Sequence, residues 1–136
     1  MSTGRRIASV ALVAVALAAA GCGGDDVESA VNEDPTTEPV AVGSTLLAGV
    51  GPGFEISLET EDGTAVSTLS AGEYTIEVDD QADIHNFHLT GPGVDEDSGV
   101  SETGTSTWTV TFEAGSYEFV CDPHASQLNG SFEVTG

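Results

Sequence analysis

A thiol and an imidazole lie three residues apart in the C-terminal stretch CDPHASQLNG, which begins at Cys121 and contains His124. The other two histidines, His85 and His88, occur earlier in DIHNFHLTG, and the second cysteine is Cys22. Thiolate sulfur and imidazole nitrogen together bind transition metals. Cys121, His124 and an upstream histidine therefore form a candidate metal site.

Only one of the two upstream histidines is expected to join this site, because residues three apart on a strand point to opposite faces. The other is then a hydrogen-bonded structural histidine. A thiolate with two imidazoles is the ligand set of a trigonal copper site. A zinc hydrolase with an open water position is the alternative. It lacks a carboxylate at a suitable spacing, since Asp122 is expected to point away from the metal, so no enzyme is predicted.

The elements that must position these residues are strands. Apolar residues alternate with polar ones in five segments: FEISLE, GEYTIEVDD, TWTVTF, SYEFVC and SFEV, with inward residues that include Phe54, Tyr74 and Trp108. Glycine, proline, asparagine and aspartate separate the segments. The polar stretch DEDSGVSETGTST, residues 95–107, is expected to be a solvated loop. Period-two alternation without helical periodicity predicts an all-β antiparallel sandwich or barrel. Cys121 shares the inward parity of Tyr117, so it ends a buried strand.

The motif YEFVCDPH, the returning LNG and FEV, and the distant HN pair resemble the cupredoxins, the plastocyanin-like and azurin-like blue copper proteins. The resemblance covers residues 46–136. It implies a Greek-key β-sandwich or barrel of about seven to eight strands that binds one copper ion, Cu(I) or Cu(II). The family's ligands fall on His85, Cys121 and His124. Its asparagine after the first histidine falls on Asn86, which would brace the cysteine loop.

The axial position departs from the family, which usually supplies a methionine after the loop histidine. Met1 is the only methionine, and Gln127 and Leu128 follow the loop histidine instead. Alignment of LNG puts Leu128 in the axial slot, where it cannot ligate. Gln127 is the second choice, and the backbone carbonyl of Ile84 is a weak donor. Loss of an axial donor stabilises Cu(I), which predicts a raised reduction potential.

The N-terminus has the features of an export signal. Arg5 and Arg6 precede the apolar run IASVALVAVALAAA, and LAAAGC resembles a bacterial lipobox in which Cys22 is lipid-modified. An ordinary signal peptide cut near Ala20 is the alternative, and the arginine pair leaves twin-arginine or general export open. We expect a signal over residues 1–21, an acidic disordered tether over 22–45, and a lipid-anchored domain over 46–136 that faces the outside or the periplasm.

The charge is extreme: 23 Asp and Glu against 2 Lys and Arg give a net charge of −21, and both cations precede residue 7. No side chain is left to neutralise phosphates, which excludes nucleic acid as a partner. The charge fits either attraction to a basic redox partner or adaptation to a salty medium.

These observations predict a monomeric type 1 copper protein that carries single electrons at the cell surface or in the periplasm, with an unidentified redox protein as partner. The alternative is a copper buffer or carrier without electron transfer. A domain that has lost its metal is disfavoured, because the ligand set is complete.

Overall fold

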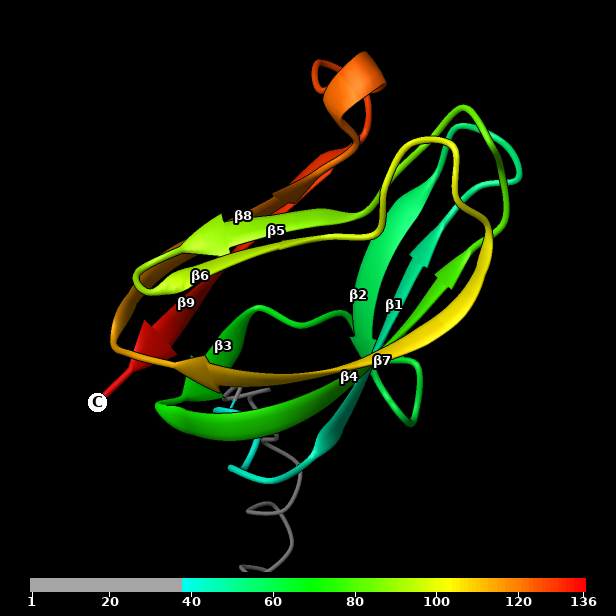
Figure 1. The fold of residues 1–136 in the computed structure, drawn as a ribbon. Helices are drawn as coiled ribbons and strands as arrows, with labels where there is room; N and C mark the ends of the chain where they lie inside the picture. Colours follow the sequence, from blue (N-terminus) through cyan, green and yellow to red (C-terminus); the bar gives the residue numbers. More distant parts are fainter. Residues whose placement is uncertain (1–37) are drawn as a thin grey trace, which may run out of the picture. The chain divides into compact units, whose positions relative to one another are not determined.

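The computed structural model describes residues 38–136, which form two β-sheets around a shared core (Figure 1). One sheet has the strand order β2-β1-β4-β7 and the other β3-β9-β8-β5-β6. The strands are β1 (Thr45–Val50), β2 (Ile56–Thr60), β3 (Thr68–Ser70), β4 (Gly72–Asp80), β5 (His88–Gly91), β6 (Val94–Asp97), β7 (Gly104–Phe112), β8 (Gly115–Val120) and β9 (Asn129–Thr135). The predicted β-sandwich is confirmed, with slightly more strands than expected.

The chain crosses repeatedly between the two sheets. It changes sheet before and after β3, between β4 and β5, between β6 and β7, and again between β7 and β8. Most neighbours are antiparallel, and β1–β4 and β3–β9 are parallel pairs. These crossovers bring the β4–β5 loop beside the segment that follows β8, where the short 3₁₀ helix η2 (Asp122–His124) lies.

Alternating side chains from both sheets fill the core, as the sequence pattern predicts. Aromatic rings form its centre: Phe87 stacks on Phe119 and Tyr117 on Phe132, each pair with ring centroids 5.4 Å apart. The Tyr117 hydroxyl donates to the Pro92 carbonyl at 2.8 Å and accepts the Glu113 N–H at 3.0 Å, and so ties the β7–β8 turn to the β5–β6 turn. This packing makes β8 a rigid support for the residue that follows it.

Two expectations about strands are wrong. Phe54 was predicted to face inward, but β2 begins only at Ile56, and the Phe54 side chain is 62 % exposed. The turn through Gly51, whose φ is +75°, releases the chain from the sheet before the strand starts. The polar stretch after residue 94 was predicted to be a loop, but its first part forms β6, whose polar residues face outward at a sheet edge.

Contacts with the sandwich begin earlier than the predicted domain start at residue 46. Val40 bridges Leu69, and its carbonyl lies 2.7 Å from the Tyr74 hydroxyl. The signal, the lipobox with Cys22 and the tether up to residue 37 lie outside the described residues. Within residues 38–136, no helix has the length and apolar character needed to cross a membrane.

Candidate metal centre

Three donor atoms converge at one end of the sandwich. The Nδ1 atoms of His85 and His124 are 3.2 Å apart, and the Cys121 Sγ lies 3.5 Å from each of them. The sequence predicted this set, and the fold brings it together from two distant segments. Within the described residues, these three side chains form the cluster of His, Cys, Asp or Glu side chains that could hold a metal ion.

Cys121 and His124 are held by a tight loop between β8 and β9. Cys121 is fully buried, and Pro123 lies in the first turn of η2, where its missing N–H costs nothing. The His124 N–H donates to the Cys121 carbonyl at 2.9 Å, and the Leu128 N–H donates to the His124 carbonyl at 2.9 Å. The Cys121 N–H in turn donates to the Leu128 carbonyl at 3.0 Å. The loop is therefore closed by its own backbone.

His85 lies in the β4–β5 loop and is fully buried. Its Nδ1 faces the other donors, and its Nε2 has no hydrogen-bond partner among residues 38–136. Packing therefore orients the ring. A Cβ on Gly51 would lie 3.4 Å from the ring carbon Cδ2 of His85 and 3.0 Å from the Ala82 Cβ. This close approach and the φ of +75° both disfavour a residue with a Cβ at position 51.

Phe54 covers the two histidine rings from outside. Its ring meets His85 edge-on at a centroid distance of 5.3 Å and His124 at 4.9 Å. Sequence reasoning placed Phe54 in the core and missed this contact. The only sequence signal was the neighbouring GPG turn, which breaks the strand before it.

The triangle of donor atoms fits one metal ion. The nearest point equidistant from the three atoms lies about 2.0 Å from each, close to the roughly 2.0–2.1 Å of zinc–imidazole bonds and shorter than the roughly 2.3 Å of zinc–thiolate bonds. Two imidazoles and one thiolate in a trigonal arrangement are the donor set of blue copper centres. The donor set and its spacing therefore suit a single copper ion.

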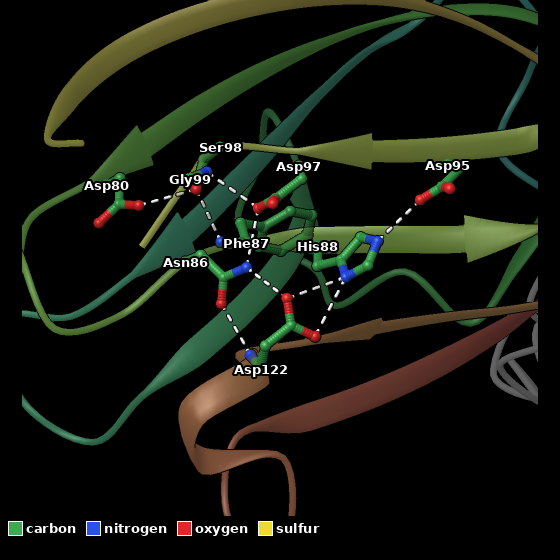
Figure 2. A network of polar contacts seen from close by, with 9 residues as sticks. All are labelled: Asp80, Asn86, Phe87, His88, Asp95, Asp97, Ser98, Gly99 and Asp122. Carbon is green, nitrogen blue, oxygen red and sulfur yellow. Dashed lines mark hydrogen bonds and ion pairs between the residues drawn. The ribbon is translucent and has the colours of Figure 1, made fainter. Parts of the chain in front are cut away.

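Asn86 joins the β4–β5 loop to the segment that follows β8, as Figure 2 shows. Its Oδ1 accepts the Asp122 backbone N–H at 2.7 Å, and its Nδ2 donates to Asp122 Oδ2 at 2.7 Å and to Asp97 Oδ1 at 2.8 Å. The Asn86 and His88 hydrogen bonds hold the pKa of Asp122 below its usual value. Asp122 points into this network and not toward the donor cluster, as expected.

The other residues that the sequence suggested near the metal differ in how far they are buried. His88 is outside the cluster and contacts Asp95 and Asp122, in agreement with its predicted structural role. Leu128 is 2 % exposed, whereas Gln127 lies on the surface. The Ile84 side chain is exposed, and a weak contact of its backbone carbonyl with the metal stays a prediction.

No protein-family model and no curated protein matches this sequence. Solved structures of rusticyanin match the fold. A methionine-to-glutamine variant of rusticyanin has a TM-score of 0.52 and 25 % identity over 71 % of this chain and 82 % of that chain. Reduced rusticyanin has a TM-score of 0.50 and 22 % identity over 72 % of this chain and 81 % of that chain. Rusticyanin is a cupredoxin, so the similarity confirms the predicted cupredoxin fold.

Proposed function

We propose that this chain, which has the cupredoxin fold, is a mononuclear type 1 copper protein that carries single electrons. The proposed ligands are the His85 Nδ1, the Cys121 Sγ and the His124 Nδ1. The observation that carries the proposal is the convergence of these atoms within 3.2–3.5 Å of one another. Copper, when bound, supplies the one-electron couple.

The protein's own part in this function is to hold the donors still and keep water away. His85 and Cys121 are fully buried, and His124 is partly exposed. The closed loop and the Asn86 bridge limit donor movement between oxidation states, which keeps reorganisation small. The partly exposed ring of His124 is the proposed point of electron exchange. No catalytic reaction is part of this proposal.

Leu128 is proposed to occupy the axial position without ligating. Its burial supports this, because Gln127 points into solvent and would have to enter the site to bind. An apolar axial neighbour favours Cu(I), so the reduction potential is expected to be high for this ligand set.

Storage or delivery of copper is the second candidate function. The lack of any methionine beyond Met1 favours it, since no thioether is available to tune the site for electron transfer. Exchange of electrons with a redox protein distinguishes the two functions.

We further propose that the protein acts outside the cytoplasm as a monomer, anchored to the membrane by a lipid on Cys22. The lipobox-like LAAAGC supports the anchor, and the second, unpaired thiol at Cys121 fits a metal ligand in an oxidising compartment. Mass spectrometry of the membrane fraction tests the lipid, and an unmodified N-terminus near Ala20 would contradict it.

The test of the copper site is the spectrum of the full chain after addition of one equivalent of Cu(II). We expect an intense blue absorption that bleaches with a mild reductant, together with the paramagnetic signal of a type 1 centre. Cys121→Ser should abolish the colour, whereas Ser126→Ala, an exposed change in the same loop, should keep it. A colourless protein, or a blue Cys121→Ser variant, refutes the proposal. Reduction by a cytochrome then separates electron transfer from storage.

A further inference from the structure

His88 lies between carboxylates from two directions. Its Nε2 is 2.8 Å from Asp95 Oδ1, and its Nδ1 is 3.0 Å from Asp122 Oδ2 (Figure 2). Asp95 is on β6, which pairs with β5 on one side, and Asp122 follows β8, which pairs with β5 on the other. His88 on β5 is therefore connected through its two ring nitrogens to β6 and to the 3₁₀ helix that follows β8.

The contacts of His88 favour the protonated ring. A neutral imidazole has one N–H and cannot donate to both carboxylates, whereas the imidazolium donates to both. The groups that face His88 are Asp95 and Asp97 on β6 and Asp122 beyond β8. The Asp95 hydrogen bond and the Asp122 interactions raise the pKa of His88, although burial opposes them. The sequence has no Lys or Arg after residue 6, so no such side chain can replace this charge.

Asp122 links this cation to the candidate metal centre. It is the residue after Cys121 and belongs to the same 3₁₀ turn as His124. Its carboxylate reaches His88, while its backbone N–H is held by Asn86. A positive ring at position 88 therefore restrains the segment that carries two of the three donors.

We propose that protonated His88 is the positioning residue for the segment 121–124, which it clamps through Asp122. This inference rests on the proposed function, because the clamped segment carries two of the three proposed copper ligands. Because the folded state raises the pKa of His88, its stabilising contribution is complete below the unfolded value of about 6.5. The contribution is lost as the pH rises through the higher, folded value.

Amide hydrogen exchange of the copper-free full chain tests the clamp, read by NMR at the Asp122 and Leu128 N–H groups. At pH 6 we expect His88→Asn to exchange about fivefold faster than the natural protein at both amides, which corresponds to about 1 kcal/mol. An amide of the central strand β4, such as that of Val78, is the internal control and should not change. The difference should shrink as the pH rises and His88 loses its proton.

His88→Lys supplies the rescue, because its charge does not titrate in this range. We expect natural protection at pH 6 and better protection than the natural protein at high pH. The comparison of His88→Lys with the natural protein tests the clamp even if His88→Asn does not fold. Equal amide exchange rates in the natural protein and both variants at pH 6 overturn the proposal. It is also overturned if His88→Asn exchanges faster by the same factor at every pH and His88→Lys exchanges equally fast. These measurements use no copper, so a failure of the clamp can be distinguished from a failure of the proposed copper site.

Discussion

Replacing Asn86 with alanine tests how much one buried side chain contributes to holding the donor loop. Asn86 is fully buried and makes three hydrogen bonds, to the Asp97 carboxylate, the Asp122 carboxylate and the Asp122 N–H. Hydrogen bonds to charged groups contribute about 1.5–3 kcal/mol and neutral ones about 0.5–1.5 kcal/mol. The three hydrogen bonds share one side chain and the Asp122 side chain is half exposed, so their individual contributions do not add. We expect a loss of about 3 kcal/mol.

The assay is urea unfolding of the copper-free full chain, supported by thermal unfolding. A loss of about 3 kcal/mol lowers the melting temperature by roughly 12–24 °C in a domain of this size. Asn129→Ala is the matched control: Asn129 lies at the other end of the same loop, is exposed, and donates one hydrogen bond to the Ala125 carbonyl at 2.7 Å. We expect this control to cost less than about 1 kcal/mol. Equal losses for the two variants would refute the assigned role of Asn86.

Three further predictions concern the axial position, the aromatic cover and the charge. Leu128→Met should lower the reduction potential measured by voltammetry, because a thioether stabilises Cu(II), whereas Gln127→Met on the surface should leave it unchanged; a potential that does not fall contradicts the axial assignment. Phe54→Ala should release copper to a chelator about fivefold faster, since an aromatic contact contributes about 0.5–1.5 kcal/mol, and Phe54→Leu should be intermediate; identical rates would mean that the ring shields nothing. Raising the salt from about 0.01 M to 1 M shortens the screening length from roughly 30 to 3 Å. Relief of about 1 kcal/mol of self-repulsion should then raise the melting temperature by about 4–8 °C, and an unchanged value would exclude repulsion as a limit on stability.

The sequence predicted the sandwich and the pairing of Cys121 with His124 for local reasons, whereas His85 was selected over His88 only by the resemblance of its HN pair to the cupredoxins. Period-two alternation records which face of a strand is buried, so it identified the five segments that became β2, β4, β7, β8 and β9. The Cys121 to His124 spacing is likewise local, because a short turn closes over it. Prediction failed where the alternation was interrupted. Phe54 follows a glycine turn, and β6 has a single apolar residue, Val94, so neither carried a period-two pattern.

Only the tertiary structure decided which side chains from separate segments meet. The approach of His85 to Cys121, and of His88 to Asp122, depends on the crossover that places β5 between β6 and β8 and on the register of those strands. The same packing buries Leu128, leaves Gln127 in solvent and lays Phe54 over the histidine rings. A sequence pattern specifies the face a residue presents, but its neighbours across the fold follow from strand order, which no local pattern contains.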